Sequence, residues 1–168
     1  MKDLQLPSLP TGLMPLLLCF GLAACGREVM RPMQDLNSSL LQSASSRREP
    51  AFGRLWLASL SNYQGREKIE LLDLRSRRPV PLPGLNRPDS HPISVSVSAN
   101  GERLALVRQR GDQTELLLYQ RSLGTVQRLE LSAKGIPRKV SLDGFGRLLA
   151  VQVSRDGRWD VDLIRLSS

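Results

Sequence analysis

The chain has 168 residues, a formal net charge of +8 and 40% hydrophobic but only 4% aromatic residues, which fits one folded domain of ordinary size with an N-terminal extension. Its two cysteines, Cys19 and Cys25, both lie near the N-terminus, so the rest of the chain can form neither a disulfide nor a thiolate metal site. The single histidine, His91, and the lack of a Gly-rich phosphate loop before a helix argue against an enzyme, and we expect no catalytic residue, metal or cofactor.

An apolar run, Leu13 to Ala24, follows a polar start that contains Lys2. The run is too short for a membrane-spanning helix, which needs roughly 20 residues, and fits the apolar region of an export signal. It ends in Leu22-Ala23-Ala24-Cys25, which resembles the lipobox of bacterial lipoproteins. The resemblance implies cleavage before Cys25 and lipid on this residue, and so a membrane-anchored protein of the cell envelope that faces the periplasm. An ordinary secretory signal and an uncleaved anchor are the alternatives.

Residues 25–52 are polar and rich in serine, with little sustained periodicity. We therefore expect a flexible tether between a signal peptide, residues 1–24, and a β domain, residues 53–168. Within the tether, Pro32 and Pro50 limit any helix around Leu36 to Leu41 to one or two turns.

The densest basic segment of the β domain holds Arg75, Arg77 and Arg78, followed by Arg87. We interpret these four residues as candidate contacts for an anionic envelope polymer or for lipid headgroups. Aromatic residues, on which bases would stack, are sparse, so nucleic acid is not the expected partner.

From residue 53 onward, apolar and polar residues alternate with a period of two, which predicts β-strands. The clearest unit is Ile93 to Leu131, whose apolar-rich runs are separated by Asn100-Gly101, Gly111-Asp112 and Gly124, the residue types that hairpin turns need. It predicts four short antiparallel strands. They cover Ile93–Val97, Leu104–Val107, Glu115–Tyr119 and Thr125–Leu131.

This unit recurs on both sides. Gly101 to Leu106 aligns with Gly146 to Val151 at an offset of 45 residues, and Leu57 to Leu60 aligns with Leu104 to Val107 at an offset of 47. About three copies of such a repeat are typical of β-propeller blades, each a four-stranded antiparallel sheet that buries its faces against its neighbours. The sequence therefore predicts an all-β fold of blade-like sheets.

Two copies read Ser98-Ala99-Asn100-Gly101 and Ser141-Leu142-Asp143-Gly144 before an apolar strand, and the third retains Leu71-Leu72-Asp73-Leu74. These segments resemble the TolB-type propeller repeat. The resemblance implies blade-like sheets and, as a function, protein–protein binding in the periplasm. TolB-type propellers have six blades, so three copies leave open a partial propeller, a propeller-like sandwich or a homo-oligomer that completes a ring.

Four aspartates of the last copy raise the alternative of a calcium or acid–base site. They are Asp143, Asp156, Asp160 and Asp162. The first two are each followed by glycine, as hairpin turns require, and the last two alternate along a strand, as polar residues do on a half-exposed strand. We favour the structural interpretation. The main hypothesis is thus a non-enzymatic envelope lipoprotein that binds another protein, and the alternative is a basic binder of anionic polymer.

Overall fold

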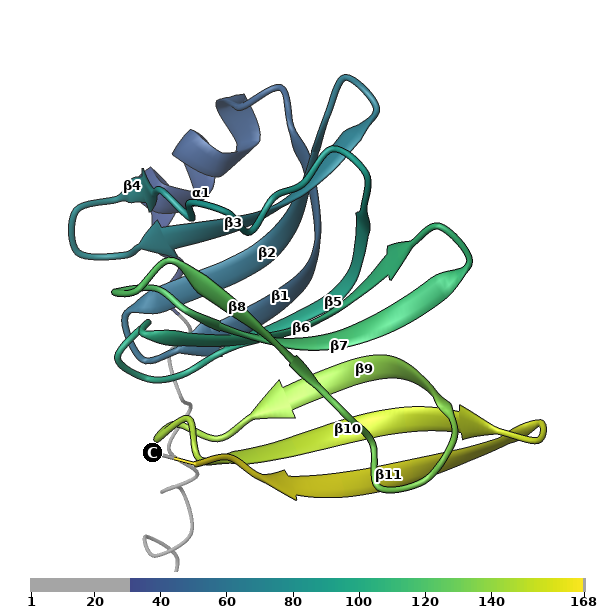
Figure 1. Ribbon diagram of the computed structural model, residues 1–168. Coiled ribbons are helices and arrows are strands. Elements are labelled where there is room, and N and C mark those ends of the chain that lie inside the picture. The colour runs from purple at the N-terminus through teal and green to yellow at the C-terminus, as the bar shows by residue number, and fades with distance from the viewer. Residues whose placement is uncertain (1–30, 168) are drawn as a thin grey trace, which may run out of the picture. The chain divides into compact units, whose positions relative to one another are not determined.

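The computed structural model describes residues 31–167, and the residues from Asp35 onward form one compact unit. Within the described residues, helix α1 (Gln34–Gln42) precedes three antiparallel sheets (Figure 1). The first sheet contains β1 (Ser46–Gly53), β2 (Trp56–Tyr63), β3 (Arg66–Asp73) and β4 (Arg78–Val80). The second contains β5 (His91–Val97), β6 (Arg103–Arg110), β7 (Gln113–Gln120) and β8 (Thr125–Leu129). The third contains β9 (Ile136–Leu142), β10 (Leu148–Arg155) and β11 (Arg158–Arg165).

Every strand pairs with the next one in its sheet, so each sheet is a simple meander. The strands β2, β6 and β10 begin at Trp56, Arg103 and Leu148, which reproduces the predicted offsets of 47 and 45 residues. The structure therefore confirms an all-β fold of three blade-like repeats, arranged as a partial propeller (Figure 1). Among the described residues the third repeat has three strands, where four were expected.

Tight two-residue turns set the register of the middle hairpins. Arg155 pairs with Arg158 across Asp156-Gly157, and the two turn residues have φ values of 47° and 81°. A type I′ hairpin turn requires positive φ at both central positions, and Asp-Gly supplies it at low steric cost. The structure thus confirms that Asp156 is a turn residue.

Two apolar cores fill the spaces between the sheets. Leu71 and Tyr119 belong to the core between the first and second sheets, and Val151 to the core between the second and third. Strand β6 serves both cores, because Leu104 points into the first and Val107 into the second. The second sheet is therefore covered on both faces, as a propeller blade is.

The folded unit begins before the predicted boundary at residue 53. Helix α1 and all of β1 except Gly53 lie within residues 25–52, which the sequence predicted to be a tether. The helix packs Leu36 and Leu40 on the face of the first sheet that is turned away from the second sheet. It contacts Leu57, Leu72 and Leu74 there. Helix α1 covers Leu36 to Leu41, where the sequence allowed a short helix, but its packing on the sheet was not predicted, because its packed apolar residues, Leu36 and Leu40, are too few to indicate a buried face.

Candidate binding groove

The first strands of the three sheets, β1, β5 and β9, lie next to one another. Each strand is interrupted by a bulge: the register shifts after Arg48 in β1, after Pro92 in β5 and at Arg138 in β9. A bulge bends a strand and re-aims its side chains, and bulges are common beside functional sites. In a propeller these inner strands line the central channel.

A groove of about 340 Å³ runs along the inner strands, and we call it the inner-strand groove. Residues from all three strands line it: Glu49, Pro50, Ala51, Phe52, Ser94, Val95, Ser96, Lys139, Val140, Ser141 and Leu142. Phe52 is 68% exposed beside it, which is unusual for a large aromatic side chain. The groove therefore combines an exposed apolar side chain with the buried serines Ser94 and Ser96, whose hydroxyls bond within the fold.

Glu49 is the point at which the three inner strands meet. The Ser94 hydroxyl donates a hydrogen bond to Glu49 Oε2 at 3.5 Å, and Lys139 Nζ lies 3.6 Å from the same oxygen. Ser94 Oγ also accepts a hydrogen bond from the Val140 N–H at 3.3 Å, which ties β5 to β9. Glu49 has a φ of 51°, a strained value for a residue other than glycine. Glu49 lies in the bulge of β1, so the bulge imposes this backbone conformation and aims the carboxylate at Ser94 and Lys139.

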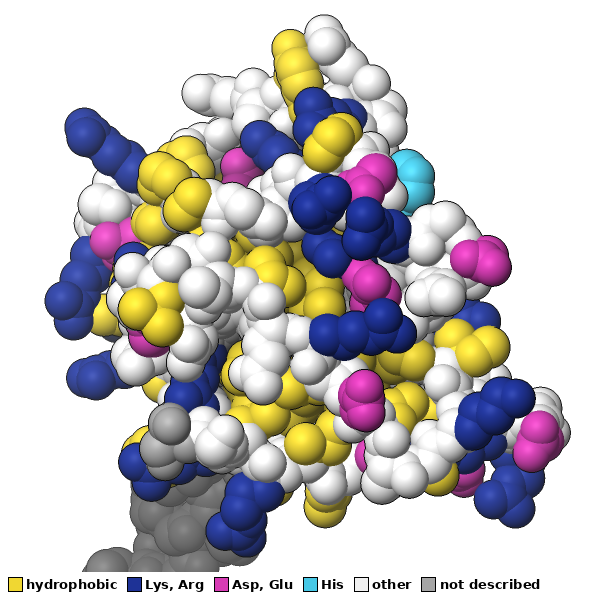
Figure 2. Space-filling model, viewed as in Figure 1, with side chains coloured by type: hydrophobic (Ala, Val, Ile, Leu, Met, Phe, Trp, Pro, Cys, Tyr) yellow, Lys and Arg dark blue, Asp and Glu magenta, His cyan; other side chains and the backbone are white. Residues whose placement is uncertain are grey.

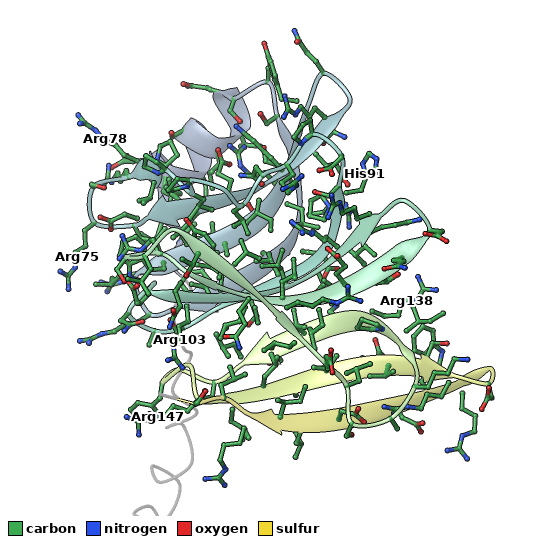
Figure 3. All side chains as sticks on the ribbon, viewed as in Figure 1. Arg75, Arg78, His91, Arg103, Arg138 and Arg147 are labelled. Atoms are coloured by element: carbon green, nitrogen blue, oxygen red, sulfur yellow. The ribbon has the colours of Figure 1, made fainter. Side chains whose placement is uncertain are left out.

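Three of the four predicted arginines lie together. Arg75, Arg77 and Arg78 lie in or beside the turn between β3 and β4 and are exposed. Figure 3 shows Arg75 and Arg78 projecting from one side of the fold, whereas His91, exposed at the start of β5, lies on the opposite side. Arg77 is 3.3 Å from Asp35 Oδ2, and within the described residues no ion pair involves Arg75 or Arg78.

Arg87, the fourth predicted arginine, does not join the other three. It lines a small cavity beside Glu67, near the opposite end of β3. Its Nε lies 2.9 Å from Asp89 Oδ1, and Arg110 Nε lies 2.9 Å from the other oxygen of that carboxylate. The guanidinium groups, that of Arg87 first, hold the pKa of Asp89 at about 2, below its ordinary value of 3.8. Figure 2 shows basic and acidic side chains interleaved near the histidine, so this region is an ion-pair network and not a uniform basic patch.

A second hollow, of about 300 Å³, lies beside Arg75. It is also lined by Arg54, Trp56 and Asn100. Arg54 was not among the predicted contacts, because it lies 21 residues before Arg75 in the sequence and reaches it only through the pairing of β1, β2 and β3.

The aspartates of the last repeat have structural roles. The carboxylate of Asp143 accepts hydrogen bonds from backbone N–H groups of its own turn, that of Leu148 foremost, and these lower its pKa. Asp162 forms a two-point ion pair with Arg155, at 2.6 and 3.0 Å, and Asp160 Oδ2 lies 3.6 Å from the same guanidinium. Within residues 31–167, no group of three or more His, Cys, Asp and Glu side chains could hold a metal ion.

Cys25 and the predicted signal peptide lie outside the described residues. In the part of the chain that is described, no helix is long and apolar enough to cross a membrane.

Sequence reasoning missed the inner-strand groove, although a signal for it was present. Glu49, Ser94 and Lys139 are spaced by 45 residues, which is one of the repeat offsets. Applied to the first strand of each repeat, the offset of 45 residues places these three residues at equivalent positions of the three blades. Equivalent positions on adjacent blades lie side by side, as the structure shows for these residues.

No protein-family model and no curated protein matches the chain, but solved structures match it in fold. TolB from Acinetobacter baumannii is 17% identical with a TM-score of 0.56, and the match covers 73% of this chain and 30% of that chain. A putative TolB from Agrobacterium tumefaciens is 20% identical with a TM-score of 0.52, covering 66% and 39%. A puromycin-hydrolysing peptidase from Mycobacterium tuberculosis is 16% identical with a TM-score of 0.52, covering 72% and 19%.

The chain has a TolB-like β-propeller fold. Its match spans 30% and 39% of the two TolB chains, in keeping with three blades. At these identities the likeness shows the fold alone. Since a peptidase shares the fold, the fold by itself does not decide between binding and catalysis.

Proposed function

We propose that this chain is a non-enzymatic lipoprotein of the cell envelope, whose TolB-like domain binds another protein in the periplasm through the inner-strand groove. Residues 1–24 act as the signal peptide, lipid on Cys25 anchors the protein in the membrane, and the residues between Cys25 and α1 form a short tether. The inner-strand groove is the observation that carries the proposal.

The groove has the composition of a protein-binding surface. Phe52 supplies an exposed aromatic anchor, and aromatic residues in the centre of an interface often contribute most of its binding energy. Ser94 and Ser96 line the groove beside it, and Lys139, which is exposed, marks one end. An aromatic centre with a polar rim is the usual anatomy of such interfaces, and Lys139 is the exposed polar residue at this rim, since Ser94 and Ser96 are buried. The carboxylate of Glu49 is held by Ser94 and Lys139, which suits a role in shaping the groove.

Photo-cross-linking in the intact envelope tests the groove. A photoreactive amino acid replaces Phe52 in one variant and Leu123, which is 67% exposed in the turn between β7 and β8, in the control. We expect an adduct of one defined mass at position 52 and none at position 123. Adding Lys139→Glu, which places a second carboxylate beside Glu49, should weaken the adduct at least several-fold. Equal cross-linking at positions 52 and 123, or none at 52, would reject the groove as the binding site.

Lipid labelling tests the anchor separately. With radiolabelled palmitate, Cys25→Ser should lose the label and leave the membrane fraction, because the thioether forms only on this residue. Cys19→Ser, the matched control, should keep both. Unchanged labelling of Cys25→Ser would contradict the lipoprotein assignment without bearing on the groove.

The second candidate function is binding of an anionic envelope polymer or lipid headgroups by the arginines around the β3–β4 turn. The observation that favours it is the hollow in which Arg54 and Arg75 meet, with Arg78 exposed nearby. Arg75→Gln with Arg78→Gln should lower binding to anionic vesicles and flatten its dependence on salt. Arg87→Gln is the control, because Asp89 already pairs with Arg87. Binding that is equal in all variants would exclude this function.

A further inference from the structure

The third sheet leaves one edge and one face uncovered among the described residues. Within residues 31–167 β11 pairs only with β10, and Figure 1 shows it as the outermost strand of its sheet. Its apolar side chains Trp159, Val161 and Leu163 are 62%, 67% and 69% exposed. They alternate with two aspartates that face the second core. An open strand edge whose outer face carries an apolar row indicates a docking surface.

The opposite end of the unit is closed. Helix α1 covers the outer face of the first sheet, which is the face that a second copy would need in order to complete a ring. Strand β4, the edge of that sheet, has three residues including Pro79 and is followed by Pro81. Short length and proline are common devices that prevent edge pairing. β11 has neither of these two devices, since it is eight residues long and contains no proline. Inward-facing charges also discourage edge pairing, and β11 carries two of them, Asp160 and Asp162.

The central five residues of β11 have the same pattern in both directions. Read from either end, Trp159-Asp160-Val161-Asp162-Leu163 alternates apolar and acidic residues about Val161. Two such strands paired antiparallel about Val161 place Val161 opposite its own copy and Trp159 opposite Leu163 of the second copy. The three exposed apolar side chains of each copy then face apolar side chains across the new pair, which stabilises strand pairing, while Ile164 lies opposite Arg158.

We propose that a second copy of this chain docks here, β11 against β11, so that the two third sheets join into one continuous six-stranded sheet. The contact uses the same surface on both copies and therefore closes at a dimer. An unrelated partner strand would not require a symmetric pattern. The inference does not depend on the proposed function.

The two aspartates do not oppose this pairing. Within each chain Arg155 Nη2 lies 2.6 Å from Asp162 Oδ2, and Arg158 Nη2 lies 3.3 Å from Asp160 Oδ1. Across the new pair, Asp160 of one copy lies opposite Asp162 of the other. Because each carboxylate already pairs with an arginine of its own chain, their mutual repulsion is largely neutralised.

Disulfide cross-linking tests the axis. On an antiparallel pair, facing Cβ atoms lie about 4.5–5.5 Å apart, close to the separation that a disulfide bridges. The full-length chain is prepared with Cys19→Ser and Cys25→Ser, and Val161→Cys or Leu123→Cys is added. Under mild oxidation most of the Val161→Cys chain should migrate at twice 18.7 kDa. The Leu123→Cys chain, equally exposed at that site, should stay monomeric. Trp159→Cys and Leu163→Cys chains, when mixed, should cross-link to each other more than to themselves.

Sedimentation of the full-length chain gives an independent readout. The parent chain should sediment as a dimer and Val161→Lys as a folded monomer, because this side chain is exposed in the single chain. The thermal midpoint of the parent should depend on concentration and that of Val161→Lys should not. A monomeric parent, or equal cross-linking at positions 123 and 161, overturns the proposal. So does a Val161→Cys adduct with a different protein, or a dimer that forms only after residues 1–30 are removed, which would assign the face to the chain's own N-terminal segment. None of these four results would alter the photo-cross-link expected at Phe52, so they leave the proposed binding groove untouched.

Discussion

The indole ring of Trp56, on β2, lies so close to Gly101, in the turn between β5 and β6, that a Cβ on Gly101 would overlap it. The guanidinium of Arg121 lies 4.9 Å from the centre of the same ring, and Arg121 Nε donates a hydrogen bond to the Gly101 carbonyl at 2.8 Å. Three residues from two sheets thus share one contact, which joins the first blade to the second.

This contact makes Gly101 more sensitive than another glycine of the same conformation. Gly101 and Gly111 have φ values of 69° and 61°, but among residues 31–167 no atom lies within 4 Å of the position that a Cβ on Gly111 would take. Gly111→Ala should therefore lower the free energy of unfolding by about 1 kcal/mol, the cost of a left-handed backbone. Gly101→Ala should cost roughly 2 kcal/mol more, because the core is overpacked. Urea denaturation measures the free energy of unfolding of both variants. Equal losses would show that the indole ring of Trp56 moves aside at no cost.

The hydroxyl of Ser96 holds β5 to β9, since it accepts the Leu142 N–H at 2.9 Å. Ser96→Ala should lower the free energy of unfolding by about 1–2 kcal/mol, because a buried N–H loses its partner. Ser61→Ala is the matched control: Ser61 Oγ is buried without a hydrogen-bond partner among the described residues. Its removal should leave stability unchanged or raise it. A larger loss for Ser61→Ala than for Ser96→Ala, by urea denaturation, would contradict this assignment.

The pKa of Asp89, lowered to about 2 by Arg87 and Arg110, predicts a pH-dependent contribution to stability. Because the folded pKa lies below the ordinary value of 3.8, the carboxylate stabilises the fold above that value and loses its effect as pH falls through about 2. Asp89→Asn should therefore be less stable than the parent at pH 5 and equal to it below pH 2. Carboxyl NMR titration should show the pKa rising more in Arg87→Gln than in Arg110→Gln. The opposite order would place the main interaction on Arg110.

A buried ion pair links β6 to β7, with Arg108 Nε 2.8 Å from Glu115 Oε2. Glu115→Ala leaves a buried guanidinium without its main partner and should cost about 3–5 kcal/mol, whereas Arg108→Met with Glu115→Leu should cost far less. Breaking the exposed pair of Arg158 and Asp160 by Arg158→Met should cost under about 1 kcal/mol. A double-mutant cycle on unfolding free energies measures the coupling, and additive effects of the two buried substitutions would refute it.

Much of the fold could be predicted because its signals are local. The four predicted strands of the middle repeat all exist, with ends shifted by a few residues at most. Turns such as Asp156-Gly157 can be recognised in the sequence because few residue types tolerate positive φ. Because the strand pattern of the middle repeat recurs at offsets of 45 and 47 residues, the prediction of one sheet became a prediction of three.

The sequence by itself determined the strands, the turns and the repeat, since alternation and turn chemistry depend on neighbours in the chain. Only the tertiary structure decided which residues come together and which surfaces stay exposed to solvent. It packs α1 on the first sheet, separates Arg87 from Arg75 to Arg78, and brings Glu49, Ser94 and Lys139 together from three strands. It also leaves the apolar row of β11 exposed. These outcomes depend on contacts between residues far apart in the chain, which the packing of whole sheets selects and which no local pattern records.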